Sequence, residues 1–109
     1  MNLKPLYRGD SRRLKITFTL NNVPLVLTGG TVKFTVKRDI NDTYANAIIK
    51  KTVTTFTENY LYIDIVASDT SGLTEGDIFV YDIEFTDVNG FKTTVMSGEF
   101  PIILDVTND

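Results

Sequence analysis

The stretch of residues 76–103 constrains the fold more than any other part of the chain. Large apolar side chains occupy every second position from Phe79 to Phe85 and alternate with Val80, Asp82, Glu84 and Thr86, which is the period-two pattern of a strand with one buried face. The Asn89-Gly90 dipeptide follows, and it favours a two-residue type I′ turn because both residues accept a positive φ. The sequence therefore predicts a β-hairpin across this stretch.

A two-residue loop also predicts which residues face one another across the hairpin. The expected pairs are Val88 with Phe91, Phe85 with Thr94, Ile83 with Met96, Tyr81 with Gly98, and Phe79 with Phe100. This register gathers the bulky apolar side chains on one face, whereas a slip of one residue would bring Ser97 and Glu99 to that face. We therefore expect burial to hold the register and the hairpin to form the core of the fold.

The rest of the chain supplies further strands separated by turn residues. Alternation predicts strands near residues 14–20, 32–36 and 61–65. A short strand is also expected at residues 25–27, and an edge strand explains the mixed faces of residues 47–55. Short strands at this spacing, joined by Gly, Asn and Asp turns, are typical of a two-sheet sandwich. We therefore expect an all-β, immunoglobulin-like, two-sheet antiparallel β-sandwich of about seven strands, with a small barrel as the main competitor.

A chain of 109 residues has the length of one domain. We expect a single β-sandwich domain over residues 14–104, preceded by an N-terminal segment of residues 1–13 that leads into it. Residues 105–109 are expected to form a C-terminal tail or the start of a linker.

Two short motifs have competing interpretations. The Arg-Gly-Asp tripeptide at residues 8–10 matches the integrin-binding sequence, but Gly-Asp before a strand is also ordinary turn chemistry, and we predict a turn. The Asp-x-Asn-Asp run at residues 39–42 offers oxygen ligands of the kind that calcium takes. It lacks the glycine and the downstream glutamate of an EF-hand loop, so we expect a polar loop without a metal.

Composition removes several classes of function. The chain has neither cysteine nor histidine, which excludes disulfides, zinc sites of the usual ligand types and histidine-dependent catalytic triads. A formal net charge of −3 at pH 7 disfavours a nucleic-acid partner, which usually meets a basic surface. The first residues have no long apolar run, so we expect neither a signal peptide nor contact with a membrane.

The best candidates for acid–base chemistry are Asp82 and Glu84, which share one face of the predicted hairpin. They lie on the polar side of a regular strand, where charges ordinarily belong, and the sequence predicts no desolvated cleft around them. Gly29-Gly30 is not followed by the Lys-Ser/Thr of a phosphate-binding loop. We therefore predict that the protein is not an enzyme and uses no cofactor.

Two pairs of residues are candidates for contact with a partner or a glycan. Tyr60 and Tyr62 face outward on their predicted strand, and such a pair could form a platform for a sugar or a protein, or simply pack on the solvent face. Lys50 and Lys51 lie on a strand with mixed faces, which is typical of a sheet edge where lysines discourage unwanted pairing.

The order of short motifs along the chain resembles a known family. The motifs occupy residues 8–11, 16–19, 26–37, 47–52, 69–76, 81–87, 89–90, 97–102 and 105–107. In this order they resemble the immunoglobulin-like N-terminal domain of baseplate upper proteins and related tail proteins of phages and prophages of Gram-positive bacteria.

This resemblance implies a non-catalytic structural module of a phage or prophage tail, which acts through protein–protein contacts with other tail or baseplate proteins. It also implies a homo-oligomer in the assembled particle, and a location in the tail or baseplate of the virion after synthesis in the cytoplasm of the bacterial host. The alternative from another class is a carbohydrate-binding or adhesive β-sandwich module that uses the two tyrosines.

Overall fold

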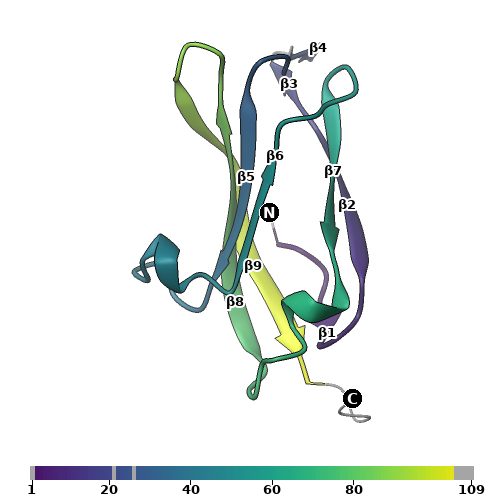
Figure 1. Cartoon of the computed structure of the whole chain (residues 1–109), viewed down its shortest axis with the longest axis vertical. Coiled ribbons are helices and arrows are strands. Elements are labelled where there is room, and N and C mark those ends of the chain that lie inside the picture. Colours follow the sequence, from purple (N-terminus) through teal and green to yellow (C-terminus); the bar gives the residue numbers. More distant parts are fainter. Residues whose placement is uncertain (1, 21, 26, 105–109) are drawn as a thin grey trace.

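The computed structural model in Figure 1 contains the predicted hairpin, which is formed by β8 (Asp77–Thr86) and β9 (Lys92–Ile103). The structure describes residues 2–20, 22–25 and 27–104. The other strands are β1 (Leu6–Tyr7), β2 (Arg12–Thr17), β3 (Thr19–Leu20), β4 (Val23–Pro24), β5 (Thr31–Lys37), β6 (Ile49–Val53) and β7 (Tyr60–Ile65). Two single-turn 3-10 helices, η1 (Tyr44–Asn46) and η2 (Ala67–Asp69), complete the described elements. The expectation of an all-β protein is confirmed.

The lower part of the hairpin has the predicted register. Phe79 lies opposite Phe100, Tyr81 opposite Gly98, and Ile83 opposite Met96. All three residues of β8 are buried, with at most 3% of each side chain exposed. Burial of one face therefore holds this register, as the alternation of side chains predicts.

The upper part of the hairpin corrects the predicted turn. The loop has three residues, because Asp87 and Phe91 pair through a backbone hydrogen bond of 2.9 Å, and Val88 does not face Phe91. The N–H of Gly90 donates to the carbonyl of Asp87 (3.0 Å), and Gly90 has a φ of 88°. This is a type I turn followed by a left-handed residue, the usual three-residue hairpin loop.

The Asp87 side chain explains why the longer loop forms. Its Oδ1 accepts hydrogen bonds from the backbone N–H groups of Asn89 (2.8 Å) and Phe91 (3.0 Å). The longer loop shifts the pairing by one residue, so that Phe85 faces Thr93 instead of the predicted Thr94. A bulge that leaves Val95 without an opposite residue then restores the predicted register from Ile83 onward.

The described strands form one large sheet and two small ones. The large sheet has the order β1-β9-β8-β5-β6, and it is mixed, because β1 runs parallel to β9 while the other neighbours are antiparallel. The expectation of purely antiparallel pairing is therefore wrong at this edge. In the second sheet β2 pairs with β7, and β3 and β4 form a short hairpin.

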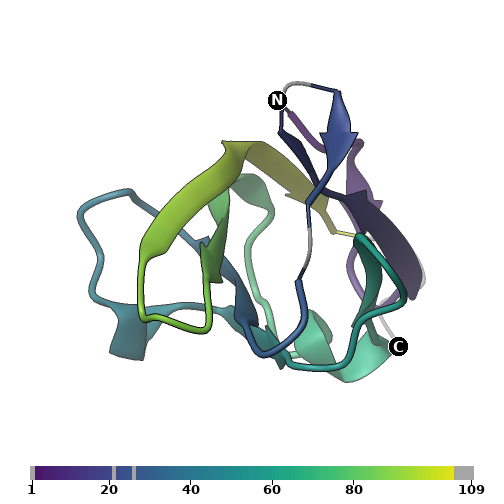
Figure 2. The same cartoon turned by 90° about the horizontal axis from the view of Figure 1, so that it is seen from above.

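The core lies between the five-stranded sheet and the β2–β7 sheet. Figure 2 looks down on the strands and shows the two sheets on opposite sides of the interior. The buried side chains alternate along the strands of both sheets and include Val32, Phe34, Val36, Leu61, Ile63, Ile65, Phe79, Ile83 and Phe100. The ring of Phe34 lies 6.0 Å from that of Tyr81, and Phe18 meets Phe85 edge to face at 5.7 Å.

The N-terminal segment takes part in the main sheet. Residues 1–13 were expected only to lead into the domain, but Leu6 is buried and β1 pairs with the end of β9. The Arg-Gly-Asp tripeptide forms the predicted turn, since the N–H of Asp10 donates to the carbonyl of Tyr7 (3.0 Å) and Gly9 has a φ of 83°.

Two other expected segments involve residues outside the described part. The short strand expected at residues 25–27 includes residue 26, which the structure does not describe, while Leu27 is fully buried. The tail or linker expected at residues 105–109, with the motif at residues 105–107, also lies outside the described residues.

Candidate interaction surfaces

The edge strand predicted from its lysines is β6, which lies at one end of the five-stranded sheet. Among the described residues no strand pairs with the outer edge of β6, so its backbone N–H and C=O groups on that side are open to another strand. Lys50 and Lys51 point to opposite faces of this strand, because consecutive side chains of a strand alternate.

Lys51 points inward and is engaged within the chain. Its Nζ lies 2.8 Å from Oδ2 and 3.0 Å from Oδ1 of Asp69, which follows β7 in η2. Only 27% of the Lys51 side chain and 18% of the Asp69 side chain are exposed. Lys51 therefore has a role inside the molecule, in which the ion pair ties the edge strand to the connection between the sheets, and its contact with a partner stays a prediction.

Lys50 points outward and packs beside an aromatic ring. Its Nζ lies 5.1 Å from the centre of the Tyr44 ring, and Nζ of Lys33 lies 5.7 Å from the same ring. Lys50 is exposed and Tyr44 is 46% exposed, so this group is accessible to a partner.

Tyr60 and Tyr62 face outward on β7, as predicted, and they touch each other. Their ring centres are 5.8 Å apart and the ring planes make an angle of 77°, an edge-to-face arrangement. Tyr62 is 46% exposed, whereas Tyr60 is half-buried. The two rings therefore do not form one flat platform.

Cations from β2 lie over both tyrosine rings. Nζ of Lys15 lies 4.4 Å from the centre of the Tyr60 ring, and Cζ of Arg13 lies 5.1 Å from that of Tyr62. Arg13 also binds Asp64 with two hydrogen bonds, of 2.7 and 3.1 Å. The hydrogen bond from Arg13 lowers the pKa of the Asp64 carboxyl, burial opposes this change, and the positive charges of Arg13 and Lys51 lower the pKa further. We call this surface, formed by Arg13, Lys15, Tyr60, Tyr62 and Asp64, the aromatic face.

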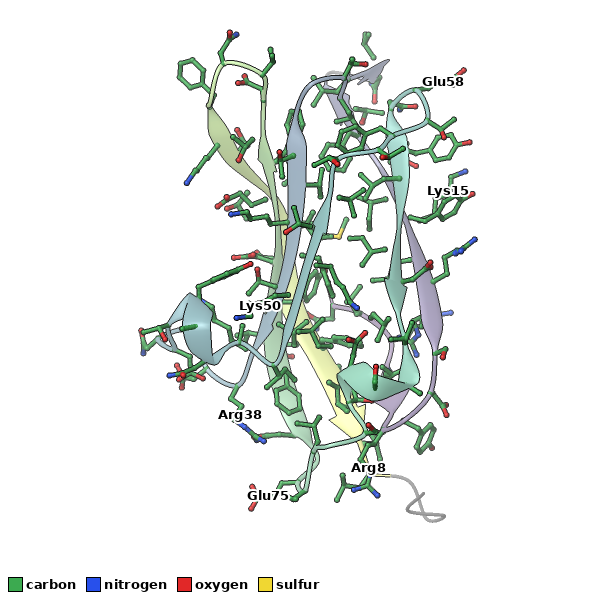
Figure 3. The ribbon with its side chains drawn as sticks, in the orientation of Figure 1. Arg8, Lys15, Arg38, Lys50, Glu58 and Glu75 are labelled. Atoms are coloured by element: carbon green, nitrogen blue, oxygen red, sulfur yellow. The ribbon has the colours of Figure 1, made fainter. Side chains whose placement is uncertain are left out.

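The structure does not bring the two predicted pairs together. The aromatic face is on the outside of the β2–β7 sheet, and Lys50 is on the outside of the five-stranded sheet. Figure 3 shows Lys15 and Lys50 on opposite sides of the molecule.

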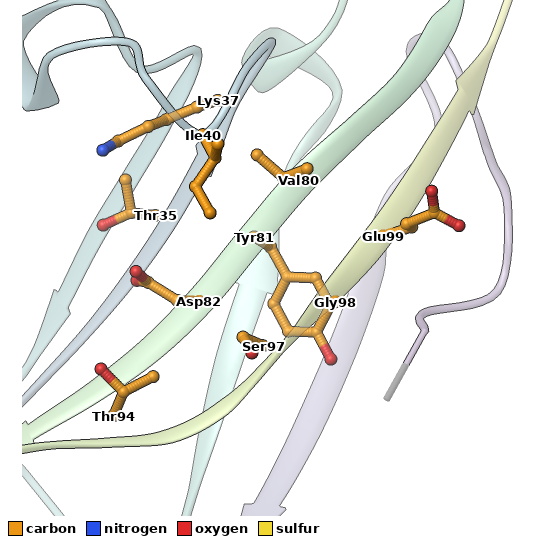
Figure 4. A pocket seen from close by; sticks show the side chains of 10 residues that line it. All are labelled: Thr35, Lys37, Ile40, Val80, Tyr81, Asp82, Thr94, Ser97, Gly98 and Glu99. Atoms are coloured by element: carbon orange, nitrogen blue, oxygen red, sulfur yellow. The ribbon is translucent and has the colours of Figure 1, made fainter.

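We call the solvent side of the five-stranded sheet the outer face. It contains a hollow that the sequence did not predict. The hollow has a volume of about 480 Å³, and its lining includes Thr35, Ile40, Val80, Asp82, Ser97 and Glu99. Figure 4 shows Ile40 and Lys37 at one side of the hollow and Glu99 at the other, with Val80 between them. Ile40 lines the hollow because of the path that the loop takes after β5. The alternation of side chains does not predict the path of a loop.

The hollow changes the environment of one predicted acid. Burial raises the pKa of the Asp82 carboxyl, the neighbouring Glu84 carboxylate raises it further, and the Lys37 ammonium opposes both effects. The sequence predicted no desolvation at this position.

The outer face otherwise presents lysines on β5 and β6 and carboxylates on β8 and β9. Within residues 2–20, 22–25 and 27–104, no group of three or more Asp and Glu side chains is placed to hold a metal ion. Asp39, a residue of the run weighed for calcium, accepts a hydrogen bond from the backbone N–H of Asn41 (2.9 Å), as in an ordinary turn. None of the described helices is long and apolar enough to span a membrane.

No protein-family model matches this sequence, and a search of curated proteins finds no match either. The function of this chain is therefore inferred from its strand edges, its surface side chains and the order of its sequence motifs.

Proposed function

We propose that this chain is a non-catalytic, immunoglobulin-like assembly module of a phage or prophage tail, which binds a neighbouring tail or baseplate protein through the open edge of β6. The observation that carries the proposal is this edge, which lies at the end of a five-stranded sheet and is unpaired among the described strands. An open edge binds an extended segment of another protein by main-chain hydrogen bonds, which need no special side chains.

The distribution of strands between the sheets supports the immunoglobulin-like description. In a variable-type immunoglobulin domain, strands B and E lie in one sheet, and strands G, F, C and C′ lie in the other. Here β2 and β7 pair with each other, and β9, β8, β5 and β6 are neighbours in that order. The order of motifs that resembles baseplate upper proteins supports the placement of this module in a phage tail.

The charge of β6 indicates the chemistry of its partner. Lys50 is exposed beside the open edge, whereas Lys51 is neutralised by Asp69. Two copies of β6 paired with each other would bring Lys50 side chains near one another, which disfavours self-pairing. The partner is therefore a segment of a different protein, extended and carrying an acidic residue at the position that faces Lys50.

The geometry of the aromatic face supports protein assembly over the carbohydrate-binding alternative. A sugar ring stacks on an open aromatic face, but a cation lies over the ring of each tyrosine, and the rings are nearly perpendicular. The tyrosines instead stabilise the outside of the β2–β7 sheet through contacts with Arg13 and Lys15.

The test is co-expression of the chain with the products of neighbouring tail genes, beside a glycan array with the purified chain. We expect a tail protein to co-purify with the chain, with loss of the complex in Lys50→Glu and retention in the matched variant Lys92→Glu at the other end of the sheet. Specific glycan binding that Tyr62→Ala abolishes, without a tail protein recovered, would overturn the proposal in favour of an adhesive module.

A further inference from the structure

The charged side chains of the outer face are sorted by strand. Lysines occupy the side of β5 and β6, where Lys33, Lys37 and Lys50 point outward. Carboxylates occupy the side of β8 and β9, where Asp82, Glu84 and Glu99 point outward. The boundary between the two charges runs along the strands, between β5 and β8. Lys92, at the hairpin end of β9, is the exception to this division.

Among the described residues, none of these lysines forms an ion pair with one of these carboxylates. The ion pairs among the described residues, at N···O distances up to 4.0 Å, are Arg13–Asp64 and Lys51–Asp69, and neither is on the outer face. Lys33 and Glu84 are direct cross-strand neighbours, yet Lys33 lies over the Tyr44 ring. The outer face therefore presents a positive half and a negative half to its surroundings.

The shape of the outer face is divided in the same way. The loop between β5 and β6 projects from the positive half, and Figure 2 shows it extending away from the sheet. Ile40 in this loop is 77% exposed. The hollow lies mainly over the negative half, where Val80 forms part of its apolar lining. A projection and a hollow thus lie side by side.

We propose that two copies of this chain associate through their outer faces, around a two-fold axis that runs parallel to the strands at the β5–β8 boundary. Such an axis places the positive half of each copy against the negative half of the other, and brings each projecting loop over the hollow of the partner. A two-fold axis that also lies between the two faces but runs perpendicular to the strands would instead place like charges against each other. The charge pattern therefore selects one of the two symmetric arrangements.

The proposed pairing predicts particular contacts. Lys33 of each copy faces Glu84 of the other, Thr35 faces Asp82, and Ile40 enters the apolar part of the opposite hollow. An apolar centre with a charged rim is the usual composition of a specific interface. The raised pKa of Asp82 is consistent with a carboxyl already partly desolvated at the centre of this surface. The pair uses the outer face and not the edge of β6. The inference therefore does not depend on the proposed function.

The first test is sedimentation of the purified chain over a concentration series up to about 1 mM, the weak end of specific association. We expect a dimer whose dissociation constant rises with ionic strength, because salt screens the charged rim. Lys33→Glu and Glu84→Lys should each weaken the dimer at least about tenfold, since each opposes like charges across the interface. A chain that stays monomeric to the highest concentration overturns the proposal.

A mixture of two charge-reversed variants distinguishes contacts between copies from contacts within one copy. In an equal mixture of Lys33→Glu and Glu84→Lys, opposite charges face each other at both symmetric contacts, so we expect a heterodimer as tight as the unmodified dimer. If the mixture associates no better than the separate variants, the charges act only within the chain and the proposal is wrong. Ile40→Asp should also weaken the dimer, and Val23→Asp on the distant β3–β4 hairpin is the matched control. Circular dichroism establishes that each variant is folded.

The direction of the axis is tested with a single spin label. The chain has no cysteine, so Asn89→Cys in the hairpin loop gives one labelled site for each copy. An axis parallel to the strands places both labels at the same end of the dimer, and we expect a distance shorter than the 43 Å length of one copy. A distance longer than this length indicates the perpendicular axis and would overturn the proposed arrangement.

Discussion

Lys51 and Asp69 join the two sheets through an ion pair of 2.8 Å between Nζ and Oδ2. Lys51 belongs to the edge strand of the five-stranded sheet, and Asp69 lies in the turn that leaves the β2–β7 sheet. Asp69 also accepts the backbone N–H of Val66 (2.8 Å), so that one carboxylate holds both the turn and the edge strand. The edge on which the proposed function depends is therefore positioned by a contact inside the molecule.

Loss of this pair should destabilise the fold more than loss of the neighbouring lysine. We expect Lys51→Ala to lower the free energy of unfolding by about 1–3 kcal/mol, because it leaves the mostly buried Asp69 carboxylate without its cation. Lys50→Ala, which removes an exposed side chain, should change it by less than about 0.5 kcal/mol. Urea denaturation of both variants measures the difference, and equal effects would contradict the internal role of Lys51.

The core of the hairpin should be far more sensitive than its loop. Phe79 and Phe100 face each other and are fully buried, so replacement of either by alanine should cost on the order of 3–5 kcal/mol through the cavity that it leaves. Asn89→Ala should cost much less, because the turn depends on the Asp87 carboxylate and on Gly90. Denaturant midpoints in the reverse order would refute the register of β8 and β9.

Gly30 is fixed by a close approach of the main chain to β8. A Cβ atom at this position would lie 2.5 Å from Cε1 of Phe85 and 2.8 Å from the carbonyl oxygen of Thr86. We expect Gly30→Ala to lower the free energy of unfolding by about 1–3 kcal/mol through overpacking. Gly72→Ala is the matched control, since a Cβ there meets no atom within 4 Å. Thermal denaturation that ranks the control as the more harmful change would contradict this packing.

The Asp82 carboxyl should make stability depend on pH. Its pKa is raised in the folded state, so its contribution is fully present below the pKa of the unfolded chain and is lost as pH rises through the folded value. Asp82→Asn stays neutral at every pH. We therefore expect the stability of this variant, relative to the unmodified chain, to increase from about pH 3 to about pH 7. A relative stability that decreases over this range would show that the Asp82 carboxylate is stabilised by its surroundings.

The extent to which the hairpin could be predicted shows what side-chain alternation determines. The pairs from Ile83 to Phe79 follow from burial of one face, and burial is a property that alternation reveals directly. The predicted loop was one residue too short. The Asp87 carboxylate binds two backbone N–H groups, and these hydrogen bonds favour the longer turn. The bulge at Val95 then compensates, and no local pattern in the sequence marks it.

The candidate surfaces could be predicted only in part for a related reason. The outward direction of Tyr60 and Tyr62 follows from the parity of β7, but their contacts with Lys15 and Arg13 depend on the pairing of strands far apart in the sequence. The same holds for Lys51, whose partner Asp69 comes from another element. The hollow depends on the path of a loop, for which residue types give little information.

The central claim is that the open edge of β6 binds a strand of another tail protein, and amide hydrogen exchange tests it most directly. Exchange is measured on the chain alone and on its complex with the co-purified tail protein. We expect new protection in residues 49–53 on complex formation, because the added strand supplies hydrogen-bond partners for amides on the open side of β6. Protection confined to residues 60–64 on the aromatic face, with the exchange of β6 unchanged, would contradict the claim.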